Sequence, residues 1–105
     1  MQAEELNKDI ILTQLTLNSN NIKEFGVKRI GLFGSYVRNQ SNVESDIDFL
    51  VEFEPERKSY KNFIHLAYFL KNLFNSEIDL LTQKSLSPYL GPHILKEVEY
   101  VSFND

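Results

Sequence analysis

Two apolar segments joined by a polar insertion set the limits on how this chain can fold. Val27 to Phe33 (VKRIGLF) and Asp46 to Phe53 (DIDFLVEF) have the length and composition of β-strands. In the second segment, apolar and acidic residues largely alternate. Because successive side chains of a strand point to opposite faces, this alternation places Asp46 and Asp48 on the same face.

Helical patterns surround these two segments, and a third strand and a closing edge strand follow them. We expect helices, with their caps, over Glu4 to Leu17, over Asn20 to Phe25 after Asn18 or Ser19, from Ser59 to about Phe74, and from Ser87-Pro88 to about Val98. We expect the further strands over Ile78 to Leu81 and over Glu99 to Phe103. Gly91-Pro92 either kinks or restarts the last helix. Alternating strands and helices predict an α/β (α+β) fold, a small mixed β-sheet flanked by helices, in a single domain over residues 1–105.

The composition excludes several classes of protein. A hydrophobic content of 42% and a charged content of 25% are those of an ordinary globular protein. Without cysteine there is neither a disulfide framework nor a zinc–thiolate site, which fits a cytoplasmic location. A net charge of −4 lacks the basic footprint of a general nucleic-acid binder, so we expect no direct nucleic-acid binding. The apolar runs are too short to span a bilayer and the start lacks a signal-peptide pattern, so we expect no membrane association.

The step from the first strand into the insertion has the features of a phosphate-binding turn. Gly34 permits unusual φ and close backbone approach, and Ser35 offers a hydroxyl and an N–H group at the start of a short helical turn over residues 35–39. Arg38, one turn later, can reach back and bind the same phosphates in fork geometry. These three residues are the candidate nucleotide-binding residues.

Three aspartates are candidates for metal binding and catalysis. Asp46 and Asp48 share a strand face, and carboxylate oxygens are ligands for hard divalent cations. Asp79 interrupts the apolar segment Ile78 to Leu81, where an aspartate is costly unless it is paired or metal-bound. It is a candidate third ligand and a group that helps to remove a proton from an attacking hydroxyl. Two metal ions about 4 Å apart are expected at such a site.

Each of these features alone has a structural interpretation. A Gly-Ser step is usually a turn, an Asp-x-Asp strand start is usually a solvated end, and Asp79 or Arg38 alone would be an ordinary paired or surface residue. Their order within a strand–turn–strand context favours phosphate chemistry. His65 and His93 have no partners for a nucleophilic triad and receive no catalytic role. The aromatic residues are either peripheral core or a partner surface: Tyr60, Tyr68, Phe69, Tyr89 and Tyr100.

At these residues the chain resembles a known superfamily. Gly34-Ser35-Tyr36-Val37-Arg38, a polar loop and Ser45-Asp46-Ile47-Asp48 resemble the nucleotidyltransferase superfamily that includes DNA polymerase β, and more closely its minimal nucleotidyltransferases, the MNT or MntA-type antitoxins. The resemblance implies that Gly34 and Ser35 bind the triphosphate of ATP, with Arg38 as an associated basic residue. Relatives commonly carry glycine where this chain has Asn39, and asparagine tolerates positive φ, so we expect the turn to survive.

The resemblance also implies an activity and a partner. Asp46, Asp48 and Asp79 would bind Mg²⁺, and the enzyme would act as an antitoxin that transfers AMP from ATP to a tyrosine of a HEPN-type toxin (AMPylation). Two alternatives stay open: an antitoxin that neutralises its toxin by direct binding without catalysis, and nucleotidyl transfer to a small molecule such as an antibiotic. The retained carboxylates favour the enzyme, and the absence of a second domain disfavours the small-molecule acceptor.

Overall fold

The structure is a computed structural model that describes residues 5–42, 44–101 and 103. Its strands are β1 (Val27–Phe33), β2 (Ile47–Phe53), β3 (Ile78–Thr82) and β4 (Glu99–Tyr100). Its α-helices are α1 (Lys8–Leu17), α2 (Ser19–Glu24), α3 (Tyr60–Phe74) and α4 (Gly91–Glu97). Single 3₁₀ turns are η1 (Gly34–Tyr36), η2 (Pro55–Arg57) and η3 (Gln83–Ser85). The predicted mixed α/β architecture is confirmed.

The four strands form one mixed sheet with the order β3-β2-β1-β4. The central strands β1 and β2 are antiparallel, β4 is antiparallel to β1, and β3 runs parallel to β2. The parallel pairing follows from the long α3 crossover between β2 and β3, since parallel neighbours need such a connection. The starts of β2 and β3 therefore lie side by side at one end of the sheet.

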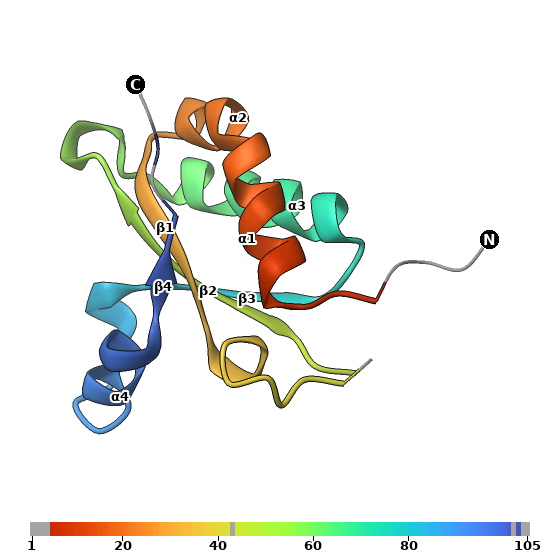
Figure 1. Cartoon of the computed structure of the whole chain (residues 1–105). Coiled ribbons are helices and arrows are strands. Elements are labelled where there is room, and N and C mark those ends of the chain that lie inside the picture. Colours follow the sequence, from red (N-terminus) through yellow and green to blue (C-terminus); the bar gives the residue numbers. More distant parts are fainter. Residues whose placement is uncertain (1–4, 43, 102, 104–105) are drawn as a thin grey trace.

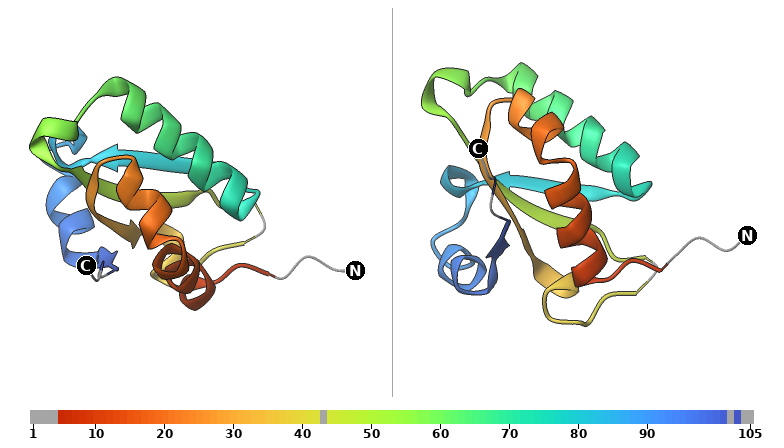
Figure 2. Two further views of the ribbon diagram at one scale, coloured as in Figure 1. Left: turned by 90° about the horizontal axis from the view of Figure 1, so that it is seen from above. Right: turned by 45° about the horizontal axis from the view of Figure 1, so that its top comes forward.

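The helices cover the two faces of the sheet unequally (Figures 1 and 2). Helices α1, α2 and α3 lie together on one face, whereas α4 lies on the other. The core fills the space between the three-helix layer and the sheet, and the Phe49 and Phe74 rings stack there with centroids 5.8 Å apart. Fully buried members from both layers are Ile11, Leu15, Ile22, Ile30, Leu32, Ile47, Phe49, Leu66 and Leu70. The other face carries α4, the buried Leu50 and, on either side of Leu50 along that face of β2, Asp48 and Glu52.

Side-chain caps set the starts of α1 and α3, whereas α2 begins after Asn18 without a side-chain cap; two predicted boundaries are corrected. The first helix begins at Lys8 because the Asn7 side chain accepts a hydrogen bond from the Ile10 N–H group; Glu4, its predicted start, lies outside the described residues. The Ser59 side chain caps α3 by accepting from the Asn62 N–H group, as predicted. Helix α2 begins one residue earlier than predicted.

The C-terminal part is shorter in regular structure than the sequence predicts. The Ser87 hydroxyl caps a turn by accepting from the Leu90 N–H group, but the α-helix restarts at Gly91, with Pro92 in its first turn. The closing strand reaches only Tyr100, although the Val101 N–H group still donates to the carbonyl of Ile30. Among the described residues, no helix has the length and apolar content to cross a membrane.

Candidate active site

The turn after β1 is closed tightly against the start of β2. Gly34 has φ +83°, in the left-handed region that favours glycine. A Cβ atom added there would overlap the carboxylate of Asp48. The close approach predicted for this glycine is therefore made by an acidic side chain of the neighbouring strand, and any larger residue would push Asp48 aside.

Strand pairing brings two of the three predicted aspartates together. Asp48 lies opposite Phe33 of β1 on one side and opposite Asp79 of β3 on the other. Asp46 immediately precedes β2, whose first residue is Ile47, so the predicted strand start is one residue too early. Asp46 and Asp79 are exposed and Asp48 is half-buried. Asp79 was expected in a buried strand, but β3 is the sheet's edge and leaves it open to solvent.

The environment of Asp48 disfavours its negative charge. Burial, followed by the negative charges of Asp79 and Asp46, raises the pKa of Asp48 from 3.8 to about 6, while Arg38 acts in the opposite direction. A carboxylate surrounded by other carboxylates gains from a nearby cation more than a solvated one does. The electrostatics therefore mark Asp48 as the carboxylate at which a cation would have the largest effect.

The donor set suits a hard divalent cation, although the three carboxylates do not converge on one point. Among the described residues, no three His, Cys, Asp or Glu side chains are arranged closely enough to hold a metal ion. Asp48 and Asp79 lie opposite each other on adjacent strands, and Asp46 lies within electrostatic range of Asp48. Carboxylate oxygens are what Mg²⁺ binds in proteins, and Mg²⁺ keeps several waters, so one or two carboxylates can carry it.

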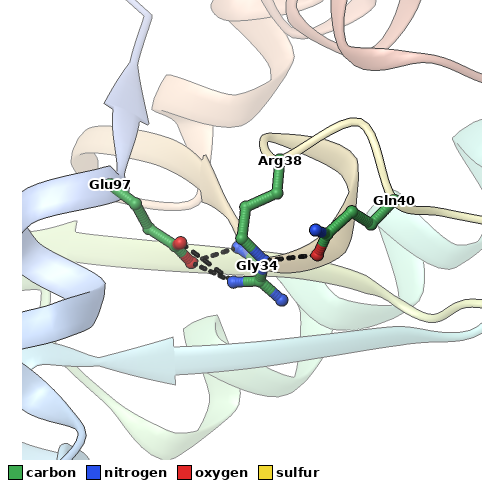
Figure 3. A network of polar contacts seen from close by, with 4 residues as sticks. All are labelled: Gly34, Arg38, Gln40 and Glu97. Atoms are coloured by element: carbon green, nitrogen blue, oxygen red, sulfur yellow. Dashed lines mark hydrogen bonds and ion pairs between the residues drawn. The ribbon is translucent and has the colours of Figure 1, made fainter.

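A second cluster surrounds the same glycine on its amide side (Figure 3). The Gly34 N–H group donates to Glu97 Oε2 at 2.7 Å. Arg38 reaches back across the turn, as predicted, and its Nη1 donates to Glu97 Oε1 at 2.9 Å and to Oε2 at 3.1 Å. Arg38 Nε donates to Gln40 Oε1 at 3.1 Å. Three donors near the predicted phosphate turn thus face protein oxygens.

The helical turn predicted over residues 35–39 is a 3₁₀ turn over Gly34–Tyr36, so it begins one residue earlier and is shorter. Ser35 is half-buried, and its carbonyl accepts a hydrogen bond from the Gln40 N–H group at 2.9 Å. Asn39 has φ +58°, so this asparagine adopts the left-handed conformation that it was expected to tolerate. Asparagine at this position therefore leaves the turn in place, as expected.

Two residues of this cluster were not predicted from the sequence: Gln40, two residues after Arg38, and the more distant Glu97. Glu97 belongs to the last turn of α4, more than fifty residues along the chain from Arg38, and has no pattern of its own. A signal was present, because Glu97 precedes the only predicted strand close to the C-terminus, and strand pairing brings chain-distant residues together. The sequence gives no way to choose β1 as the partner of that strand.

The remaining predicted features lie away from this site or have no role in it. His65 and His93 are both exposed. Of the five aromatic residues noted above, Tyr60, Tyr68 and Tyr89 are strongly exposed, whereas Phe69 and Tyr100 are partly buried. A hollow of about 600 Å³ lies at the opposite end of β2 and β3, lined by Val51, Thr82 and Lys84 among others. It does not contain the aspartates.

Known proteins share both the sequence and the fold of this chain. The model of the nucleotidyltransferase domain family matches residues 17–101. The protein adenylyltransferase MntA of Thermococcus cleftensis is 42% identical over 88 residues, which cover 83% of this chain and 88% of that protein. A solved structure assigned as a minimal nucleotidyltransferase has a TM-score of 0.77 at 24% identity and covers 92% of this chain and 98% of its own. A crystal structure of a toxin–antitoxin with AMP-PNP has a TM-score of 0.66 at 26% identity, covering 95% of this chain and 76% of its own. The chain belongs to the nucleotidyltransferase family.

Proposed function

We propose that this chain is a Mg²⁺-dependent protein adenylyltransferase that acts as an antitoxin in the cytoplasm. It transfers AMP from ATP to a tyrosine hydroxyl of a HEPN-type toxin and thereby silences the toxin. The observation that carries the proposal is the register of the two parallel strands, which sets Asp48 directly opposite Asp79 beside the Gly34 turn.

The residues divide into two groups by chemistry. Gly34, Ser35 and Arg38 form the triphosphate-binding group: Gly34 lets the phosphates approach the turn closely, and Ser35 and Arg38 supply donors and positive charge. Asp46, Asp48 and Asp79 supply oxygen ligands for up to two Mg²⁺ ions. When bound, the metal neutralises the charge on the phosphates and stabilises the pyrophosphate that leaves.

The reaction is an in-line substitution at the α-phosphorus of ATP. The tyrosine oxygen forms a bond to the α-phosphorus, and the bond from that phosphorus to the oxygen bridging the α- and β-phosphates breaks. AMP remains on the tyrosine and pyrophosphate leaves with the bonding electron pair. Asp79 accepts the hydroxyl proton, and its exposed position on the edge strand is compatible with approach of a protein-borne side chain.

The known relatives support a protein acceptor and an adenylate donor. The Thermococcus cleftensis relative is named a protein adenylyltransferase, and at 42% identity it covers most of this chain. The similar toxin–antitoxin structure contains AMP-PNP, an ATP analogue. Two proteins of similar sequence and fold therefore support the same kind of donor and a toxin as partner.

The test is to incubate the purified chain with the HEPN-type protein encoded beside it, ATP and Mg²⁺, and to measure the intact mass of that protein. We expect a gain equal to one or more AMP groups, located on tyrosine by peptide sequencing. The Asp46→Ala/Asp48→Ala variant should add none and should no longer suppress toxicity in cells. No added mass, together with toxicity still suppressed by this variant, would instead identify an antitoxin that acts by binding alone.

A second variant tests the role assigned to Asp79. Because Asp79 is exposed on an edge strand, Asp79→Ala should keep the circular dichroism spectrum and melting temperature of the wild type while transfer falls. Its residual transfer should depend more steeply on pH, since solvent hydroxide then replaces the base. Unfolding of this variant would show that Asp79 is structural.

A further inference from the structure

We propose that Glu97 is a positioning residue for the triphosphate: it anchors the turn through the Gly34 N–H group and holds the Arg38 guanidinium in the direction that receives ATP. The inference rests on the proposed function and adds a residue from the C-terminal helix to a site otherwise built from β1, η1, β2 and β3. Nothing in the family match or in the names of the relatives assigns this residue a role.

One carboxylate joins the two nucleotide-binding elements of the turn. Glu97 Oε2 accepts from the Gly34 N–H group at 2.7 Å, and both Glu97 oxygens accept from Arg38 Nη1, at 2.9 and 3.1 Å. The Glu97 side chain is only 22% exposed, against 49% for Arg38. Charge-assisted hydrogen bonds of this kind are shorter and stronger than neutral ones and fix orientation when they come in pairs. Arg38, a long flexible side chain, is thereby held in one direction.

The hydrogen bonds that fix the Arg38 guanidinium leave one of its nitrogens, Nη2, able to bind an anion. Nη1 is directed to Glu97 and Nε to Gln40, while within the described part of the chain Nη2 makes no hydrogen bond or ion pair (Figure 3). A planar guanidinium fixed at two of its nitrogens presents the third in a set direction, so less conformational entropy is lost when an anion binds.

Glu97 is itself held by its backbone. A Cβ atom added at Gly31 of β1 would lie 2.6 Å from Val98 Cγ2, so the segment after Glu97 packs directly on the strand. The next residues are tied down by β4 pairing and by Arg29 over the Tyr100 ring. The Glu97 carboxylate is therefore fixed in position and supports Arg38. It is not a mobile side chain that occupies the site until ATP binds.

The experiment compares the affinities of the full chain for ATP, inorganic triphosphate and AMP by isothermal titration calorimetry with Mg²⁺. For Glu97→Ala we expect roughly tenfold weaker binding of ATP and of triphosphate, at the lower end of the range for losing a supporting residue. AMP binding should be unchanged, because AMP lacks the further phosphates that Arg38 receives. Glu97→Gln keeps an oxygen for the Gly34 N–H group. Its affinity for ATP should therefore lie between the affinities of the wild type and of Glu97→Ala.

Two controls separate positioning from a general structural effect. Glu99→Ala removes the other acidic residue of this segment, which pairs with Lys8 outside the site, and should leave all three affinities unchanged. Arg38→Ala combined with Glu97→Ala should lose little more than Arg38→Ala alone, because the two side chains act as a unit.

Three results would overturn the inference: tighter ATP binding by Glu97→Ala, which would make Glu97 a competitor of the triphosphate; equal losses for ATP and AMP; or strictly additive losses with Arg38→Ala. A wild-type chain that binds ATP no better than AMP would instead refute the triphosphate site of the proposed function.

Discussion

The two ends of the β1–β2 pair have similar backbone geometry but differ in how the negative charge of a carboxylate is compensated. Each end has a glycine with positive φ whose missing Cβ makes room for a side chain: Gly34 for Asp48, and Gly26 for Arg57. Each end also has a carboxylate on the same face of β2. Glu52 contacts two cations, Arg29 Nε at 2.8 Å and Lys28 Nζ at 3.7 Å, whereas Asp48 lies among other carboxylates. One end satisfies its charge within the chain, and the other leaves it to a ligand.

The comparison shows that the unfavourable charge environment in this sheet lies at Asp48 and not at Glu52. Glu52 is placed as a stabilising residue would be, with opposite charges across and beside the strand. Asp48 is placed at a cost, because its burial and its neighbours disfavour ionisation. Residues held in such conflicts are typical of functional sites. The predictions below test this contrast in order of expected effect.

The largest contrast is expected in the rate of AMP transfer. Asp48→Asn should lower the rate by about a hundredfold to a thousandfold, the range for losing one electrostatic contributor to a transition state. Glu52→Gln, the matched change at the other end of β2, should keep the rate within about twofold. Single-turnover assays with saturating ATP measure both. Similar losses from both variants would mean that the two ends do not differ in function.

The two glycines give the next contrast. Gly34→Ala and Gly26→Ala should each cost about 1–3 kcal/mol in the free energy of unfolding, because both need positive φ and both added methyl groups collide with a side chain. Only Gly34→Ala should also weaken ATP binding, since its methyl displaces Asp48. Urea denaturation and calorimetry separate the two effects, and a loss of ATP binding in Gly26→Ala would contradict the division.

The pH dependence of stability without metal should identify Asp48. Its folded-state pKa of about 6 lies above its ordinary 3.8, so the folded chain binds this proton more tightly than the unfolded chain. That contribution is complete below pH 3.8 and is lost as the pH rises through about 6. Asp48→Asn should remove this decline and raise stability at pH 7.5 by about 1–2 kcal/mol, discounted because water reaches the site.

Magnesium provides the control for this pH experiment. Mg²⁺ should raise the melting temperature of the wild type at pH 7.5, because a cation favours the ionised carboxylates. It should leave Asp48→Asn almost unchanged. A wild-type stability that rises between pH 4 and pH 6 in the absence of metal would show that other carboxylates dominate the titration.

The smallest effect is expected at the satisfied end. Glu52 and its two cations are each about half exposed, so Glu52→Gln should cost no more than about 1 kcal/mol in the free energy of unfolding. Salt should reduce this difference because exposed ion pairs are screened. Thermal melts at low and high ionic strength would show it, and a loss independent of salt would point to packing instead.

The sequence predicted local elements well and contacts between distant elements less well. Both long strands, the Ser59-capped helix and the positive φ of Asn39 follow from local residue patterns. The start of α4 was left open between a kink and a restart, because proline and glycine permit both. Candidate site residues could be named only where a motif marks them, which covers Gly34, Ser35, Arg38 and the aspartates, and their roles stay predictions.

Glu97 could not be predicted, because its contacts depend on which strand pairs with the C-terminal segment. The exposure of Asp79 depends likewise on strand order. An apolar segment containing one aspartate fits a buried central strand as well as an edge strand, and only the observed order places β3 last. Pairing and order are set by the tertiary fold, and short segments carry little information about either.

The position of β3 at the rim of the sheet has a consequence for how acceptors are selected. An active group on a rim can be reached sideways, so the acceptor hydroxyl need not thread into an enclosed chamber. In the proposed transfer, a base at such an open edge does not select its acceptor by shape. Fidelity must then come from how the whole acceptor molecule is held against the enzyme, and surfaces remote from the chemistry would determine which hydroxyl is modified.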